Sequence, residues 1–117
     1  IGERKRALSL KDIERKLVDT LDTECIILPF GKENIKSVAV CSGGGSYGGF
    51  YEALELNADL YITGDTAEVY YTAKDSKMNV IFAGHHATET VGLKALSKVL
   101  EKKLKVEAVF IDLPTGL

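Results

Sequence analysis

Short apolar segments alternate with helical segments along most of this chain, and this alternation constrains the fold more than any other feature of the sequence. Strands that alternate with helices form parallel sheets covered by helices, and right-handed crossovers join them. We therefore expect an α/β fold with a parallel or mixed central sheet flanked by helices. The predicted strands are 35–41, 58–63, 78–83 and 106–113, and the predicted helices between them are 50–57, 67–77 and 87–104.

The chain shows no linker, repeat or low-complexity segment, so residues 1–117 are expected to form a single α/β domain. Its first residue is Ile1 rather than methionine, which suggests a piece of a longer chain. The last predicted helix carries apolar residues at helical spacing. We expect these residues on its inner side, against the sheet: Val91, Leu96, Val99 and Leu100.

The N-terminal part of the chain lies outside the alternating pattern. Residues 8–22 predict an amphipathic helix with Ser9 as its N-cap. Residues 25–30 predict a short strand that could pair at a sheet edge in either direction. The basic segment 2–11 is interpreted as a solvated helix face or helix end.

The composition restricts the class of protein. A length of 117 residues suits one domain with one hydrophobic core. The formal net charge of −2 gives no basic footprint for nucleic acid, and no apolar run approaches the roughly 18–20 residues of a membrane-spanning helix. Cys25 and Cys41 lie in apolar, strand-like segments without metal-type spacing, which favours reduced thiols. We expect a cytoplasmic domain that binds no membrane and, through this segment, no nucleic acid.

Polar residues lie at or just beyond the carboxyl end of each of the four predicted strands. Ligand sites in such sheets form beyond the carboxyl ends of the strands, so these residues are the candidates for function. They are Ser42 with the glycine run after it, Gly64 with Asp65, Gly84 with His85 and His86, and Asp112.

The only two histidines of the sequence stand side by side at one of these strand ends. With a helix beginning near Ala87, His85 and Glu89 would point over the same edge of the sheet, whereas His86 would point elsewhere. An imidazole beside a carboxylate is a common partial ligand set for divalent metals, and Asp65 could add a third ligand if its strand neighbours 78–83. In the alternative interpretation the histidines only pack there, and Glu89 stabilises the helix N-terminus.

The glycine run supports a different interpretation. Gly43, Gly45 and Gly48 fit the G-x-G-x-x-G pattern of dinucleotide-binding loops, after a strand and before a helix. Asp65 ends the next strand, where a ribose-binding carboxylate would stand, and helix N-terminal amides could bind a phosphate. Alternatively, the glycines only form a tight turn that lets the helix approach the strand. Both interpretations stay open.

Taken together, these segments resemble a known family in their order and spacing. They are VAVCSGGGS (38–46), ADLYITGD (58–65), NVIFAGHHATET (79–90) and VFIDLPTG (109–116). They are similar to the C-terminal half of the Nif-three-like dinuclear-metal proteins, which are often named GTP cyclohydrolase 1 type 2 homologs. The G-H-x-A-T-E element at 84–89 is the most specific part of this resemblance.

The resemblance implies that His85 and Glu89 are metal ligands and that the full-length protein holds two divalent ions, with zinc, iron and manganese as the candidates. It implies that the remaining ligands come from an N-terminal half, which no segment of this chain matches. This chain departs from the family pattern at His86, where tyrosine is usual, and at Val69, where many members have histidine. The resemblance also implies a cytoplasmic, ring-shaped homohexamer and a metal-dependent hydrolase that acts on a nucleotide such as GTP.

Three functional hypotheses follow. The first is a metal-binding domain that contributes His85 and Glu89 to a dinuclear site, lined further by Asp65, Ser42, Gly43, Gly45 and His86. The second is a Rossmann-type nucleotide-binding module, for which NAD or NADP would raise the melting temperature. The third is a non-catalytic assembly domain, because exposed sheet edges invite association.

Overall fold

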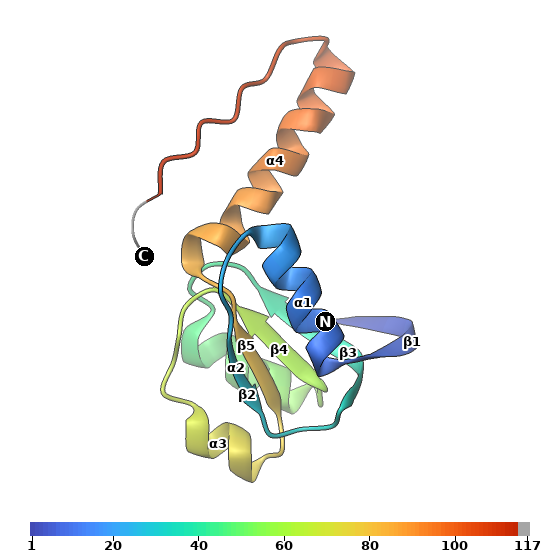
Figure 1. The fold of residues 1–117 in the computed structure, drawn as a ribbon, viewed down its shortest axis with the longest axis vertical. Helices are drawn as coiled ribbons and strands as arrows, with labels where there is room; N and C mark the ends of the chain where they lie inside the picture. Colours follow the sequence, from blue (N-terminus) through green and yellow to red (C-terminus); the bar gives the residue numbers. More distant parts are fainter. Residues whose placement is uncertain (115–117) are drawn as a thin grey trace.

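The computed structural model describes residues 1–114 of the chain, apart from the side chain of Ser46 (Figure 1). It confirms the predicted α/β class with a five-stranded mixed sheet. The elements in chain order are β1 Gly2–Ser9, α1 Leu10–Leu21, β2 Ile26–Pro29, β3 Asn34–Cys41, α2 Ser46–Glu55, β4 Leu60–Thr63, α3 Tyr70–Asp75, β5 Asn79–Phe82 and α4 His85–Leu104.

The strand order across the sheet is β1-β3-β4-β5-β2. The three central strands β3, β4 and β5 are parallel, as the alternation with helices predicts, and an antiparallel strand closes each edge. The carboxyl ends of β3, β4 and β5 therefore meet at one edge of the sheet. This arrangement places the loops after Cys41, Thr63 and Phe82 side by side.

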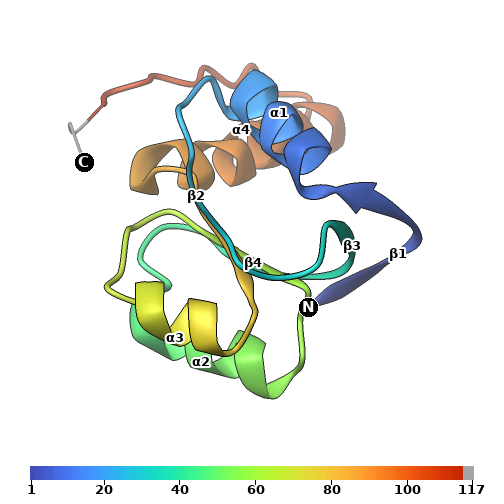
Figure 2. The same ribbon diagram turned by 60° about the horizontal axis from the view of Figure 1, so that its bottom comes forward.

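Helices cover the two faces of the sheet unequally. Figure 2 shows α2 and α3 on one face and α1 with α4 on the other. Strand β4 is buried on both faces, so its side chains alternate between two cores. Tyr61 packs with Phe50 and Val80 under α2 and α3, while Leu60 and Ile62 pack with Ile13 of α1.

Asp59, directly before β4, fastens β4 to β3. Its Oδ2 accepts the backbone amides of Lys36 and Ser37, both at 3.0 Å, and its Oδ1 lies 2.9 Å from the ammonium of Lys32. Burial on its own raises the pKa of Asp59, but the hydrogen bond from Ser37, followed by those from Lys32 and Lys36, outweighs it and lowers that pKa to about 2. The ionised carboxylate therefore stabilises the junction of the two strands.

The interpretation of residues 2–11 as a helix face or helix end is wrong. Residues Gly2–Ser9 form β1, antiparallel to β3, with Leu8 opposite Ile35 and Gly2 opposite Val38. Strand β3 would otherwise be a free sheet edge, and exposed basic side chains are typical of the strands that close such edges. The helix begins after Ser9, whose hydroxyl accepts the Asp12 amide at 3.1 Å, so the predicted N-cap is confirmed.

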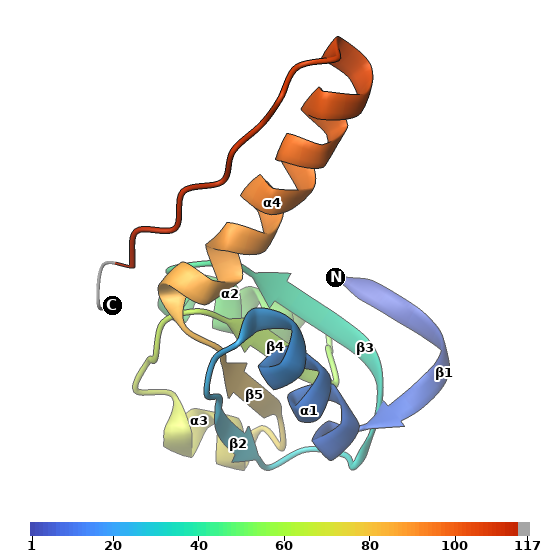
Figure 3. The same cartoon turned by 45° about the horizontal axis from the view of Figure 1, so that its top comes forward.

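The predicted strand at 106–113 is also wrong, because the described part of this segment pairs with no sheet edge. A parallel strand that continued the order β3-β4-β5 would pair with the open side of β5. Strand β2 occupies that side instead, antiparallel, with Ile26 opposite Phe82 and Pro29 opposite Asn79. Residues 106–114 instead run beside α4 (Figure 3).

Helix α4 differs from its prediction in both its start and its course. It begins at His85, not near Ala87, and it projects away from the sheet beyond its first turns (Figures 1 and 3). Four of its residues were expected on the inner side but are exposed to solvent: Val91, Leu96, Val99 and Leu100. Of the helices within residues 1–114, none combines the length and the apolar character that crossing a bilayer requires.

Candidate metal-binding site

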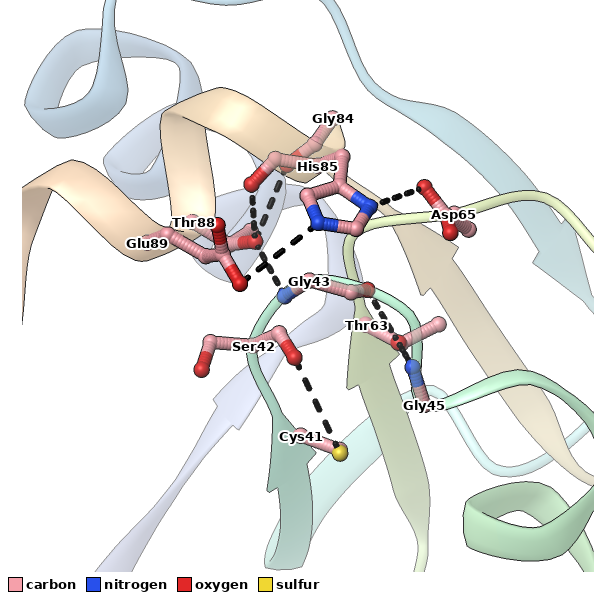
Figure 4. Close-up of polar contacts among 10 residues, drawn as sticks. All are labelled: Cys41, Ser42, Gly43, Gly45, Thr63, Asp65, Gly84, His85, Thr88 and Glu89. Atoms are coloured by element: carbon pink, nitrogen blue, oxygen red, sulfur yellow. Dashed lines mark hydrogen bonds and ion pairs between the residues drawn. The ribbon is translucent and has the colours of Figure 1, made fainter. Parts of the chain in front are cut away.

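Three loops meet where the parallel strands end (Figure 4). The loop after β3 carries Ser42 and Gly43, Asp65 follows β4, and His85 follows β5 as the first residue of α4. Strands β4 and β5 are direct neighbours, with Thr63 opposite Phe82. The condition that the sequence set for Asp65 to reach the histidine is therefore met.

His85 and Glu89 lie one helical turn apart on the same face of α4. Because the helix begins at His85, both residues have helical geometry, and Gly84 makes the abrupt turn from β5 with φ of 82°. The distance from His85 Nε2 to Glu89 Oε1 is 3.5 Å, and both side chains are partly exposed. The predicted histidine–carboxylate pair is thus present as a geometric unit.

Asp65 orients the imidazole from the other side. Its Oδ1 lies 2.8 Å from His85 Nδ1. The hydrogen bond to Asp65 is the largest cause of a raised pKa at His85; the Asp65 and Glu89 charges add to it, and burial opposes it. With Nδ1 held by a carboxylate, Nε2 faces Glu89, which is the arrangement that commonly fixes the ring of a metal-binding histidine.

Gly43 ties the three loops together through its backbone. Its carbonyl accepts the amides of Gly64 and Asp65 at 3.0 and 3.1 Å, and its own amide donates to Thr88 Oγ1 at 2.9 Å. The Thr88 hydroxyl in turn donates to the carbonyl of Gly84 or His85, at 2.9 and 3.0 Å. Sequence reasoning missed Thr88, although its place in the G-H-x-A-T-E element was a signal for it.

Gly43 lies directly against the histidine–carboxylate pair, at a position where only a residue without a side chain fits. The residue has φ of 63°, and a Cβ there would lie 2.5 Å from Glu89 Oε1 and 3.1 Å from His85 Nε2. Two ligands of a tetrahedral zinc ion stand about 3.4 Å apart, close to the 3.5 Å between the nitrogen of His85 and the oxygen of Glu89. The pair therefore fits part of a metal site.

The pair does not amount to a whole site. Zinc takes at least three protein ligands, whereas within residues 1–114 no group of three or more His, Cys, Asp or Glu side chains is placed to hold an ion. Asp65 is close, but its near oxygen is engaged by the far side of the His85 ring. A metal ion held by this pair would need further ligands from outside the described residues.

The glycine loop has the geometry of a tight turn. The Gly45 amide donates to Gly43 O and to Thr63 Oγ1, both at 3.2 Å, so the amides of Gly43 and Gly45 are used inside the protein. A Cβ at Gly45 would overlap the Tyr61 hydroxyl and lie 2.7 Å from Thr63 Oγ1. Neither amide is free for a phosphate, which takes away part of the basis for the nucleotide-binding hypothesis.

The other candidates lie at the margin. His86 points away from His85, and its Nε2 lies 2.7 Å from Asp112 Oδ1, in the extended segment after α4. Ser42 is exposed at the rim of the loop. The contact with Asp112 joins His86 to the C-terminal segment rather than to the histidine–carboxylate pair.

The fold and the site place this protein in the class of α/β proteins with a mixed sheet and a histidine–carboxylate pair beyond the parallel strands. The sequence profile of the Duf34/NIF3 (NGG1p interacting factor 3) family matches residues 1–116. The chain belongs to this family, which confirms the resemblance found in the sequence.

The chain is similar to proteins of two organisms that both have the name GTP cyclohydrolase 1 type 2 homolog. The protein of Pyrococcus horikoshii is 45% identical over 119 residues, which cover 100% of this chain and 47% of that protein. The protein of Archaeoglobus fulgidus is 38% identical over 114 residues, with 97% of this chain and 44% of that protein covered. The chain therefore spans about half the length of the relatives that it matches.

Solved structures agree with this result. Protein ybgI, described as of unknown function, superposes with a TM-score of 0.87 at 29% identity, and the match covers 99% of this chain and 47% of that one. TTHA1606 from Thermus thermophilus has a TM-score of 0.83 at 32% identity, with coverages of 95% and 44%. Reduced HcgD from Methanocaldococcus jannaschii has a TM-score of 0.78 at 28% identity, with coverages of 96% and 45%.

Proposed function

We propose that this chain is a metal-binding domain whose His85 and Glu89 contribute part of a dinuclear divalent-metal centre. The supporting observation is the convergence of His85 Nε2 and Glu89 Oε1 on the space beside Gly43. Nitrogen and carboxylate oxygen suit zinc, iron and manganese, which are the candidate ions. Asp65 holds the imidazole in the orientation that directs Nε2 to the site.

In the full-length protein the centre would serve a hydrolase that acts on a nucleotide such as GTP, as the name of the relatives suggests. A divalent ion lowers the pKa of a bound water and polarises the group under attack. The residues of this chain have simpler tasks. His85 and Glu89 would hold the ion, Asp65 orients the ring, and Gly43, which has no side chain, allows the loop to lie against the pair.

The resemblance adds a cytoplasmic location and a ring-shaped homohexamer to the proposal. Binding of nucleic acid or of a membrane by this segment is not part of it, in keeping with the net charge of −2.

The test is a calorimetric titration with zinc and with manganese of the 117-residue chain and of a chimera. In the chimera, this chain replaces the matched part of the Pyrococcus horikoshii relative, which supplies the rest of the family's length. His85→Ala is compared with His86→Ala, because the two neighbours are the same residue type and only His85 faces Glu89.

We expect His85→Ala to lower the metal stoichiometry of the chimera, and to remove any binding by the chain alone. His86→Ala should leave both unchanged. Full metal stoichiometry in the His85→Ala chimera, or equal losses in the two variants, would show that His85 is not a ligand.

A further inference from the structure

A cleft lies between β1 and α1, on the face of the sheet that α1 covers. Strand β1 pairs with β3 at its two ends, and the register shifts between the pair Glu3–Ser37 and the pair Leu8–Ile35. Between these pairs β1 advances by five residues and β3 by only two, so the extra residues of β1 bend it away from β3 (Figure 3). The cleft beside this bend has a volume of about 400 Å³.

The walls of the cleft are mostly apolar. Val40 lies in β3, an inner strand of the sheet, and is nevertheless 68% exposed because no helix covers it. A smaller hollow of about 150 Å³ continues the cleft past Val40, and Leu17, Val40 and Ile62 line both. The two hollows therefore form one continuous apolar cleft.

The charged side chains of the cleft are confined to the larger hollow. Arg4 of β1 and Lys16 of α1 line it, and neither forms an ion pair with any residue in the described part of the chain. Glu3 is the acidic residue in the same lining, so two cations face one carboxylate, although the whole chain has a net charge of −2. The lining of the smaller hollow is uncharged. The cleft thus has a basic end and an apolar end.

We propose that this cleft binds a long-chain aliphatic carboxylate. The carboxylate accepts hydrogen bonds from Arg4 and Lys16, and the alkyl chain lies along Val40 and Ile62 into the smaller hollow. Binding sites for small molecules are commonly clefts of about 300–1,000 Å³ with apolar walls and a few polar groups, as here. The proposal stands on this cleft alone and does not depend on the metal assignment.

The test is a calorimetric titration of the 117-residue chain with sodium dodecanoate below its critical micelle concentration. Two matched ligands separate the contributions of the alkyl chain and the charge. Decanoate is shorter by two methylenes and should bind about tenfold more weakly, because less apolar surface is buried. Dodecyltrimethylammonium has the same alkyl chain with the opposite charge and should bind at least about tenfold more weakly than dodecanoate.

A charge on the apolar wall should block the site. Val40→Asp should weaken dodecanoate binding at least about tenfold, because it places a carboxylate where the alkyl chain would lie. Val109→Asp is the control, because Val109 is similarly exposed, at 74%, but lies outside the cleft. Circular dichroism checks that each variant is folded.

A pair of double variants tests the basic end of the cleft and leaves the apolar wall intact. Arg4→Gln with Lys16→Gln should weaken dodecanoate binding about fivefold, which corresponds to two exposed charge pairs. Arg6→Gln with Lys11→Gln removes the same two residue types from the same strand and helix, outside the cleft, and should leave the affinity unchanged.

Several results would overturn the proposal. Equal affinity for dodecanoate and dodecyltrimethylammonium would show that the cations do not select the ligand, and equal effects of the two double variants would show the same. A dimer of the chain that Val40→Asp dissociates would identify a second copy as the occupant. Loss of dodecanoate binding in the chimera with the Pyrococcus horikoshii relative would show that the rest of a longer chain fills the cleft. His85→Ala should leave dodecanoate binding unchanged, so this proposal and the metal assignment can fail separately.

Discussion

Adding one methyl group at Gly48 or at Gly49 should have opposite effects on stability, although the two residues are neighbours in α2. A Cβ at Gly48 would have no atom within 4 Å. A Cβ at Gly49 would overlap the Tyr61 hydroxyl and lie 3.1 Å from its Cζ. Tyr61 is buried and cannot retreat, because the same hydroxyl also lies against Gly45.

The magnitudes follow from these contacts. Replacing a helical glycine by alanine stabilises by about 0.5–1 kcal/mol, so Gly48→Ala should gain this amount. Overpacking lowers the free energy of unfolding by about 1–3 kcal/mol. Since the alanine at position 49 also brings the same helical stabilisation, Gly49→Ala should destabilise the protein by about 0.5–2 kcal/mol. One kcal/mol corresponds to about 4 °C for a chain of this length. The melting temperature of Gly49→Ala should therefore lie about 4–12 °C below that of Gly48→Ala.

Thermal unfolding followed by circular dichroism measures both variants. The Tyr61→Phe background provides the control, because it removes the oxygen that Gly49→Ala would meet, and this oxygen has no hydrogen-bond partner among the described residues. In that background Gly49→Ala should recover most of its loss, so that the double-mutant cycle shows a coupling. A stabilising Gly49→Ala in the original background would refute the reasoning.

Two further predictions concern the site and the sheet. Gly43→Ala should weaken metal binding by the chimera at least about tenfold, because its Cβ would lie 2.5 Å from Glu89 Oε1. Gly48→Ala is the control and should leave metal binding unchanged. Equal metal affinity of the two variants in calorimetric titration would contradict the prediction. The pKa of Asp59 is lowered from 3.8 to about 2, so its carboxylate should add about 2 kcal/mol to the free energy of unfolding above pH 4. This stabilisation is lost as the pH falls through 2. Urea unfolding between about pH 2 and 5 measures how the free energy of unfolding changes with pH, and this change should be smaller in Asp59→Asn than in the original chain. Equal pH dependence of the two proteins would contradict the stabilising role of the Asp59 carboxylate.

Local patterns were sufficient for the parts of the fold that repeat. The apolar runs and their polar endings predicted the parallel strands, the α/β class and the pairing of His85 with Glu89, because side-chain period and strand-to-helix transitions are local properties. Helix α4 begins at His85, two residues before the predicted start near Ala87, because Gly84 turns the chain directly into the helix.

Sheet edges could not be predicted in this way. The segment that became β1 has mostly polar and charged side chains, and it is a strand only because β3 offers an edge. The segment 106–113 has the composition of a strand, but β2 had taken the position next to β5. Which strand closes an edge depends on competition between distant segments, and a single sequence does not display that competition.

Helix α4 is anchored at the candidate site by its first turn, and the rest of the helix projects away from the sheet (Figure 1). Its 20 residues span about 30 Å, and its first turn is tied to the β3 loop by the hydrogen bond from Gly43 to Thr88. A tilt of about 10° would move Leu104 by about 5 Å but would barely displace His85 at the pivot. A displacement of the far end of the helix would therefore leave the geometry of the histidine–carboxylate pair almost unchanged.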